Sequence, residues 1–557
     1  MKPFAKTLVC LAYFMLSCSG PGSHDTQRSE ERPPAPREEP NPSKVAPDED
    51  PDPPEVALGE KFFNESRFSH AYAEAWTDGD AMPPRDIAEK VTAEHLVAVG
   101  ENLTGSFKGE GMSCRHCHLV DEHAEQRGRV GSRAYSDFAP RTPIPDRGDG
   151  RDTTLRNTQQ MVDIGAAADA SRLMLHHDAE FATIEDLVRA TLTGRNMGWL
   201  PSEAKRATQH VAAVAKSTTL GYSDMLTGKR PVEPDEDDYL IPERFRVASD
   251  ASDEEYVRAV VRLITAYVKS LRFARDEDGH IGSPYDRFLL VNELPRAPAA
   301  GETDGDYTTR LRRLLAERGE YRLVDDGTLS LHGGQPFRFG EQELRGLKLF
   351  LSDADAPAKS GGVGECASCH PAPLFTDFGI HNTGVSQLEY DRAHGNGRFA
   401  ELAIPNLTKR QATPARYLPP DGQFFRVPDS ERPELADLGV WNVAANPSVS
   451  DATRARIQHV LVRQYPEDAD DDDALLRRAI GAFVTPRLRN LGHTEPYLHD
   501  GSAHTIEAVV DHYRQIGELA RTGQVRNGDQ RLTEIQLSDD DAVALAAFLR
   551  ALNEDYD

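Results

Sequence analysis

The chain has 557 residues, and its 91 acidic side chains outnumber its 64 lysines and arginines to give a formal net charge of −27. Such an excess of negative charge argues against binding to nucleic acid or to anionic lipid surfaces, and it favours a basic or neutral partner. The length exceeds that of one ordinary domain, so we expect more than one.

The first 17 residues have the pattern of an export signal. Lys2 and Lys6 precede an apolar run at 8–16 that is too short to span a bilayer as a mature helix. The run ends just before Cys18, in a pattern that resembles the processing site of bacterial lipoproteins. We therefore expect a periplasmic or cell-envelope protein that reaches the membrane only through a lipid on Cys18. The alternative is an ordinary cleaved signal with an incidental cysteine.

A proline-rich segment follows at 18–55. Ten prolines fall within positions 19–54, mixed with charged residues and serine and with almost nothing apolar. Because such a segment buries too little surface to offset its ordering entropy, we expect a disordered tether.

Helical periodicity dominates the rest of the chain, and long alternating strand patterns are scarce. Apolar residues recur at helical spacing within 253–273 and within 339–351. Ser538 is placed to cap a last helix. The apolar side of that helix would consist of Val543, Leu545, Phe548, Leu549 and Leu552. These patterns predict a mainly α protein with loop-rich stretches that suit packing around a cofactor.

Two short motifs, CRHCH at 114–118 and CASCH at 366–370, have the Cys-x-x-Cys-His spacing of covalent haem attachment. On one helical turn, residues i and i+3 lie on the same face, so the paired thiols can bond the two vinyl groups of one porphyrin. The adjacent histidine can then ligate the iron. The residues concerned are Cys114, Cys117, His118, Cys366, Cys369 and His370.

A zinc ribbon is the main alternative, and the spacing argues against it. Ribbons normally bring their two Cys-x-x-Cys halves within about 15–20 residues of each other, whereas here His118 ends one motif and Cys366 begins the next. The other two of the six cysteines, Cys10 and Cys18, lie in the targeting segment. No thiol remains for a structural disulfide network, and we expect two covalently bound c-type haems.

The sequences that flank these motifs carry a family resemblance. They are ALGEKFFNESRFS at 57–69, TTLRN at 153–157, RGLKLFL at 345–351, LFTDFGIHNTG at 374–384 and TPRLRNLGHTEPYLHDGSAHTIEAVVDHY at 485–513. Together they resemble the superfamily of bacterial dihaem cytochrome c peroxidases that also contains MauG, over most of 57–552 apart from insertions at about 70–111 and 201–340. The resemblance implies two cytochrome c-like haem domains, at 56–235 and 341–557, with a helical connector at 236–340.

In that superfamily the C-terminal haem stores and relays electrons, and the N-terminal haem meets peroxide. The resemblance implies that Tyr513 is the second iron ligand of the C-terminal haem, as in the MauG branch, and a phenolate ligand would stabilise ferric iron. Ligation by His512, or a tyrosine that merely packs at a helix end, are the alternatives. The calcium site of the family matches Asn157, Thr494 and Pro496, and oxygen-only ligation suits Ca²⁺. An asparagine that only satisfies backbone donors in a turn is the alternative there.

The match departs from the family on the peroxide side of the N-terminal haem. The Trp, Gln and Glu positions of the family fall on His177, Leu187 and Asn196. Cleavage of the O–O bond needs a group that moves a proton between the two peroxide oxygens, and neither leucine nor asparagine titrates. His176 or His177 could supply that base, or one of them could bind the iron, or each could be a hydrogen-bonded surface residue. Met197 could be a sixth ligand, although a core methionine is the simpler interpretation.

Three functions are compatible with these residues. The first is a dihaem oxidoreductase that reacts with hydrogen peroxide or O₂ and takes electrons from a small c-type cytochrome, a cupredoxin or a protein substrate. The second is an electron-transfer protein with both haems six-coordinate, which Leu187 and Asn196 favour and Tyr513 disfavours. The third is a dihaem oxygenase for an organic or protein substrate, as the rubber-cleaving members of the superfamily are. We expect the first.

Overall fold

The computed structural model describes eleven ranges of the chain. They are 52–76, 111–120, 136–138, 141–164, 174–233, 238–273, 279–331, 335–359, 361–412, 422–444 and 446–553. The predicted signal peptide, Cys18 and the tether up to residue 51 lie outside these ranges, as does most of the expected insertion at 70–111. The first helix begins at Pro54, two residues inside the predicted tether.

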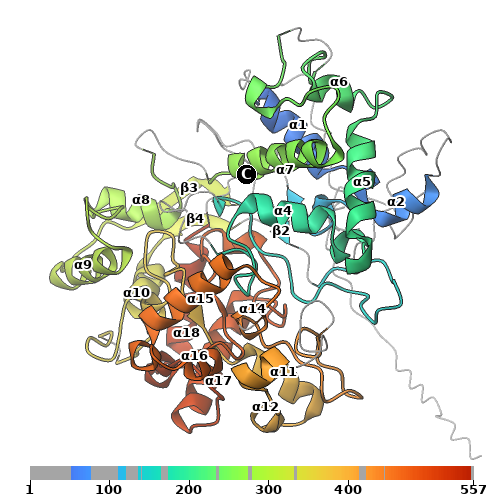
Figure 1. Ribbon diagram of the computed structural model, residues 1–557. Helices are drawn as coiled ribbons and strands as arrows, with labels where there is room; N and C mark the ends of the chain where they lie inside the picture. The colour runs from blue at the N-terminus through green and yellow to red at the C-terminus, as the bar shows by residue number, and fades with distance from the viewer. Residues whose placement is uncertain are drawn as a thin grey trace, which may run out of the picture. The chain divides into compact units, whose positions relative to one another are not determined.

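Helices make up most of the secondary structure, which confirms the predicted mainly α class (Figure 1). Before the second motif they are α1 (Pro54–Phe63), α2 (His70–Ala75), α4 (Ile184–Leu192), α5 (Ala204–Ala215), α6 (Tyr222–Leu226), α7 (Asp253–Ser270), α8 (Pro284–Val291), α9 (Asp304–Glu317) and α10 (Glu341–Phe350). After it they are α11 (Val385–His394), α12 (Arg398–Glu401), α13 (Leu407–Ala412), α14 (Trp441–Ala444), α15 (Asp451–Gln464), α16 (Asp472–Arg478), α17 (Ile506–Arg521) and α18 (Asp539–Arg550).

The strands that the structure describes form three antiparallel pairs. β1 (His118–Val120) pairs with β2 (Ser136–Phe138), β3 (Val324–Leu331) with β4 (Gln335–Phe339), and β5 (Ile380–His381) with β6 (Phe483–Val484). Within the described ranges, no helix is both long enough and apolar enough to cross a membrane.

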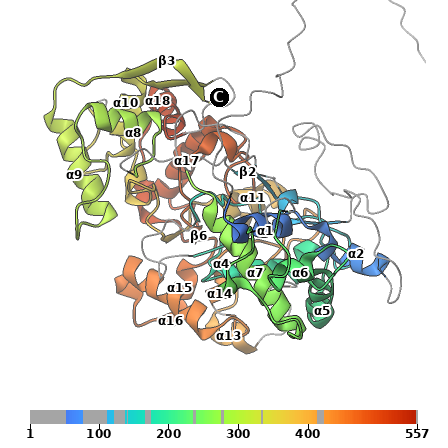
Figure 2. The ribbon, with the colours of Figure 1, turned by 90° about the horizontal axis from the view of Figure 1, so that it is seen from above.

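The first hydrophobic core is built around the crossing of α1 and α7, which lie against each other in both views (Figure 2). Gly59 permits this close approach, because a Cβ there would lie 2.1 Å from the carbonyl oxygen of Leu263. Ser252 caps α7 by accepting the N–H of Glu255, and the helix buries the apolar stripe that its sequence predicts.

A second core repeats this arrangement with α10 and α18. A Cβ on Gly346 would lie 1.9 Å from the carbonyl oxygen of Ala544, so this crossing also depends on a glycine. Ser538 caps α18 as predicted. The predicted apolar side is wrong at Val543, which is 52% exposed, since this residue faces away from the side that carries the buried Leu545 and Phe548.

A third core, made mainly of residues 380–484, was not anticipated from the sequence. It gathers α11, α12, α14, α15 and α16 around the buried Trp441. Arg156 of the TTLRN segment reaches this core and pairs with Asp437, with Nε–Oδ2 and Nη2–Oδ1 distances of 2.6 and 2.8 Å.

The segment 236–340, expected to be a connector, is shared between two cores. Its first helix, α7, packs in the first core, whereas α8, α9 and the β3–β4 pair contribute Phe288, Tyr307 and Phe339 to the second.

Candidate functional site

A cavity of about 320 Å³ opens onto the second Cys-x-x-Cys-His motif. Its walls include Cys366, Cys369, His370 and Tyr513. They also include His177 and the three residues expected to bind calcium, Asn157, Thr494 and Pro496. The fold therefore brings residues from distant parts of the chain to one cavity.

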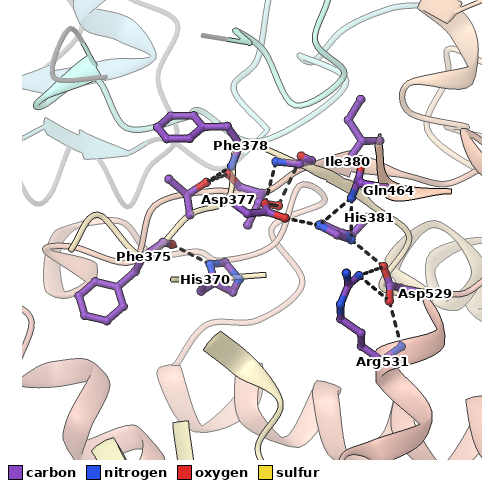
Figure 3. Close-up of polar contacts among 12 residues, drawn as sticks. His370, Phe375, Asp377, Phe378, Ile380, His381, Gln464, Asp529 and Arg531 are labelled. Atoms are coloured by element: carbon purple, nitrogen blue, oxygen red, sulfur yellow. Dashed lines mark hydrogen bonds and ion pairs between the residues drawn. The ribbon is translucent and has the colours of Figure 1, made fainter. Parts of the chain in front are cut away.

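The second motif presents two unbridged thiols and a histidine whose ring orientation is fixed by a hydrogen bond. A short 3₁₀ turn begins at Cys366, and the N–H of His370 donates to the carbonyl oxygen of Cys366 at 2.8 Å. Cys366 and Cys369 are not joined by a disulfide. Nδ1 of His370 lies 2.8 Å from the carbonyl oxygen of Phe375, as Figure 3 shows, and burial lowers the pKa of the ring. This bond assigns the proton to Nδ1 and leaves Nε2 as a lone-pair donor for a metal.

Tyr513 projects from α17 into the same cavity. Its neighbour His512, the rival ligand, uses Nε2 to donate to the carbonyl oxygen of Thr383 at 2.9 Å. Burial raises the pKa of Tyr513 well above its usual range. A phenolate at this position therefore needs a cation in the cavity to stabilise it.

A buried charged network, which was not anticipated from the sequence, lies beside the second motif (Figure 3). Nδ1 of His381 lies 2.6 Å from Oδ2 of Asp529, and its Nε2 lies 2.9 Å from Oδ2 of Asp377. Burial acts to lower the pKa of His381, but the neighbouring Cys369 and the two carboxylates reverse this and raise the pKa well above 6.5. His381 and Asp377 both belong to LFTDFGIHNTG, one of the segments that resemble the family, but nothing in the sequence indicated that they pair.

The first motif also consists of unbridged cysteines beside a half-buried histidine, His118. Cys114 and Cys117 form no disulfide, and burial raises their pKa values to about 12 and about 11. His118 begins β1, and its buried Nδ1 has no hydrogen-bond partner among the residues that the structure describes. Burial, and then the nearby His176, lower the pKa of His118 to about 4. The imidazole is thus neutral and able to donate a lone pair to a metal.

A tight loop at 176–180 presents two histidines in different directions. Hydrogen bonds between Leu175 and Phe181 close this loop. Nε2 of His177 lies 3.2 Å from the carbonyl oxygen of Asn157, on the wall of the cavity, and burial lowers its pKa to about 3. Nδ1 of His176 instead lies 3.3 Å from Oε2 of Glu180.

Two carboxylates accompany His176 in this loop, and neither was singled out from the sequence. Donor atoms of His176, Asp178 and Glu180 lie within 4.8 Å of one another, an arrangement that can share a proton or hold a cation. The buried Asp178 also pairs with Arg156 at 2.7 Å. Glu180 is only partly buried and is therefore the carboxylate with access to solvent.

Comparison with known proteins gives the family. No family model matches the chain. It is 30% identical over 192 residues to the cytochrome-c peroxidase IdrP2 of Denitromonas iodatirespirans, which covers 34% of this chain and 37% of the relative. It is 23% identical over 286 residues to cytochrome-c peroxidase IdrP1 of the same organism, covering 50% of this chain and 60% of the relative. The chain is a relative of the dihaem cytochrome c peroxidases and of MauG.

The MauG relationship has a short but close match. The chain is 54% identical over 37 residues to the methylamine utilization protein MauG of Methylorubrum extorquens, which is 7% of this chain and 10% of that protein. The matched segments thus cover between a tenth and three fifths of the lengths of these curated relatives.

Two solved structures align along most of the chain. A MauG-like protein associated with microbial copper homeostasis covers 92% of this chain and 95% of its own, at 16% identity and a TM-score of 0.41. The diheme peroxidase BthA from Burkholderia thailandensis covers 90% of this chain and 87% of its own, also at 16% identity and a TM-score of 0.41.

The donor set fits the haems that this family implies. Both motifs present two unbridged thiols next to a neutral histidine, and the second also faces a cavity with a tyrosine on its wall. The residues at the family's peroxide-side positions, Leu187 and Asn196, offer no titratable side chain. Leu187 packs against the first core, and Asn196 is a partly buried residue of a short 3₁₀ turn. Met197 is 2% exposed within the first core.

The three residues expected to bind calcium all line the cavity, and one of them, Asn157, has a buried oxygen without a described hydrogen-bond partner. Nδ2 of Asn157 donates to the carbonyl oxygen of Pro496 at 2.7 Å, while Oδ1 of Asn157 is buried without a hydrogen-bond partner in the part of the chain that the structure describes. Thr494 also lines the cavity. An orphaned amide oxygen on the residue that contacts the Pro496 carbonyl is the kind of ligand that a hard cation such as Ca²⁺ prefers.

Proposed function

We propose that this protein is an exported dihaem c-type oxidoreductase that reduces hydrogen peroxide at the first motif. The observation that carries the proposal is the cavity in which Tyr513 and a neutral His370 accompany an unbridged Cys366–Cys369 pair. This arrangement supports a tyrosine-ligated second haem that stores and relays electrons. The similarity to cytochrome-c peroxidases supports peroxide as the oxidant.

The reaction consumes one H₂O₂, two electrons and two protons and yields two water molecules. The bound haems would supply the one-electron redox chemistry. The electrons would come from a small c-type cytochrome, a cupredoxin or an oxidisable protein substrate. A basic carrier would be favoured, because the chain has a net charge of −27.

In this proposal His176 and Glu180 handle the protons. His176 lies close enough to His118 to lower its pKa, and its Nδ1 is 3.3 Å from Oε2 of Glu180. His176 would take a proton from one peroxide oxygen and return it to the other, while Glu180 would orient the ring. His177 is bonded to the carbonyl oxygen of Asn157 instead, so it would serve between the haems rather than at the peroxide.

The proposal also includes a calcium ion and export of the protein from the cytoplasm. A calcium ion between the haems would take Oδ1 of Asn157 with the carbonyl oxygens of Thr494 and Pro496, and the orphaned Oδ1 supports this. The N-terminal sequence supports delivery to the periplasm or cell envelope, with a lipid anchor at Cys18.

An electron-transfer protein with both haems six-coordinate is the second candidate. It is favoured by Leu187 and Asn196, because no titratable group stands at the two positions where the family has its peroxide-side Gln and Glu. In this alternative a histidine of the 176–180 loop would close the first iron site.

An optical and EPR spectrum of the oxidised protein, with haem stoichiometry determined alongside, separates the two candidates. Two haems per chain, one high-spin and one low-spin, together with peroxide-dependent oxidation of reduced cytochrome c, are expected for the peroxidase. Two low-spin haems and no peroxide turnover, in both the oxidised and the half-reduced protein, would establish the relay instead.

Variants then assign the residues. Tyr513→Phe should change the low-spin spectrum of the second haem and leave both haems covalently attached, whereas an unchanged spectrum would exclude tyrosine ligation. His176→Gln and Glu180→Gln should lower peroxide turnover by about 10²-fold or more, in line with the loss of an acid–base group. His459→Gln, an exposed histidine of α15, is the matched control and should keep full turnover.

A further inference from the structure

One arginine on the wall of the cavity at the second motif forms no ion pair with a described residue. The cavity is lined by two arginines, Arg487 and Arg531. Arg531 pairs with Asp529, with an Nη1–Oδ2 distance of 3.1 Å. Within the described ranges, Arg487 forms no ion pair within 4.0 Å, and the carboxylate that acts on it from farther away, that of Asp163, is already paired with Arg272.

The contacts of Arg487 use only part of its hydrogen-bonding capacity. Nη1 donates to the carbonyl oxygen of Asp163, and Nη2 donates to that of Ile164 at 3.4 Å. The guanidinium carbon also lies 5.9 Å from the centroid of the Phe378 ring. A guanidinium has five N–H donors, so most of them remain available to a further acceptor.

This environment is costly for a cation without a partner anion. Burial lowers the pKa of Arg487 to about 10, although Asp163 acts to raise it and Arg272 to lower it further, and the group stays protonated at neutral pH. The carboxylate of Asp163 lies 3.6 Å from Nη1 of Arg272, so it already has a cationic partner. A buried charge of this kind is normally matched by an anion of fitting geometry.

We propose that Arg487 binds a propionate of the haem held at Cys366, Cys369 and His370. The inference rests on the proposed haem at this motif, whose two carboxylate side chains would enter a cavity with one uncommitted cation. The planar fork of arginine matches a carboxylate in a bidentate manner, which the point charge of lysine does not. Because Arg487 also holds two carbonyl groups of 163–164, it would tie this haem to the segment that follows TTLRN.

The charge of Arg487 would also set the potential of this haem. A cation beside the propionate favours the reduced state, which carries one positive charge less on iron. Arg487→Gln should therefore lower the midpoint potential of the second haem and leave the first unchanged. We expect at least a tenfold change in its ferrous-to-ferric ratio at fixed potential, which is about 59 mV for one electron.

The test is a spectroelectrochemical titration of the full holoprotein, combined with resonance Raman of the propionate-bending band. Arg487→Gln is compared with the wild type and with Arg272→Gln, a matched control that removes a nearby, 40% exposed arginine. A lowered potential and a shifted band in Arg487→Gln alone would support the proposal. A potential and band equal to those of Arg272→Gln would overturn it and leave Arg487 with a purely structural role.

Arg487→Lys keeps the test decisive where the glutamine variant fails to fold. This variant retains the charge and loses the fork, so the band should shift while the potential changes less than tenfold, and an unchanged band would overturn the proposal. Haem stoichiometry separates the two levels of inference. Absence of haem at the second motif in the wild type would remove the proposed function itself, whereas normal haem content with unchanged potentials removes only the role of Arg487.

Discussion

Replacement of His381 by glutamine should destabilise the protein in a pH-dependent manner. His381 and Asp529 are each 4% exposed, and Asp377 is 22% exposed, so the imidazolium is clamped between two largely buried carboxylates. His381→Gln removes the cation that lies between the two carboxylates, although Asp529 keeps its ion pair with Arg531. Breaking a buried charge pair in this way costs about 3–5 kcal/mol.

The sign of the pH dependence follows from the raised pKa of His381. Its stabilising contribution is fully present below the unfolded-state value of about 6.5 and is lost as the pH rises through the folded-state value. The pKa values of Asp377 and Asp529 are lowered, so their contributions are present above about pH 4 and are lost only in acid. At pH 6 all three groups are charged. Above pH 6.5 the advantage of the wild type over His381→Gln should shrink, at about 1.4 kcal/mol per pH unit while the pH lies between the unfolded-state and folded-state pKa values.

The assay is guanidinium unfolding of the holoprotein at pH 6 and pH 8, followed by far-UV circular dichroism. His459→Gln, which removes an exposed histidine, should match the wild type at both pH values. The double variant His381→Gln/Asp529→Asn should recover part of the loss, because it removes one of the two buried negative charges that His381 had matched. An equal stability gap at pH 6 and pH 8 would show that His381 is neutral in the fold and would refute the reasoning.

Three further outcomes follow from the packing and from the cavity. Gly346→Ala should destabilise the α10–α18 crossing by about 1–3 kcal/mol or more, since its Cβ would overlap the carbonyl oxygen of Ala544. Gly305→Ala on α9, where a Cβ meets nothing closer than 3.9 Å, should be neutral or stabilising in the same unfolding assay. Treatment with EGTA should alter the haem spectra and lower Tm, with recovery on adding Ca²⁺, and Asn157→Ala should abolish that recovery; spectra insensitive to EGTA would argue against the calcium site. Arg156→Gln should cost about 3–5 kcal/mol in denaturant unfolding, because it strands Asp178 and Asp437, and a loss below 1 kcal/mol would contradict this.

The amino-acid sequence by itself determined the local features of this protein. The two Cys-x-x-Cys-His motifs, the helical stripe of α7 and the cap at Ser538 each depend on residues within one or two helical turns, and the structure shows the helix and the cap as predicted. Local periodicity failed at Val543, since apolar residues on a surface helix need not all face the core. The family relationship was also visible in the flanking sequences.

Only the tertiary structure decided which distant residues meet. The pairing of His381 with Asp529 spans 148 positions, and that of Arg156 with Asp437 spans 281. No periodicity encodes such contacts, because they depend on how segments far apart in the sequence pack against one another. The fold likewise decided that His512 bonds to a backbone carbonyl while Tyr513 faces the cavity. It also placed His176 beside Glu180 and, among the described residues, left Arg487 without an ion pair, since burial and proximity, rather than residue type, decide whether a charge is matched.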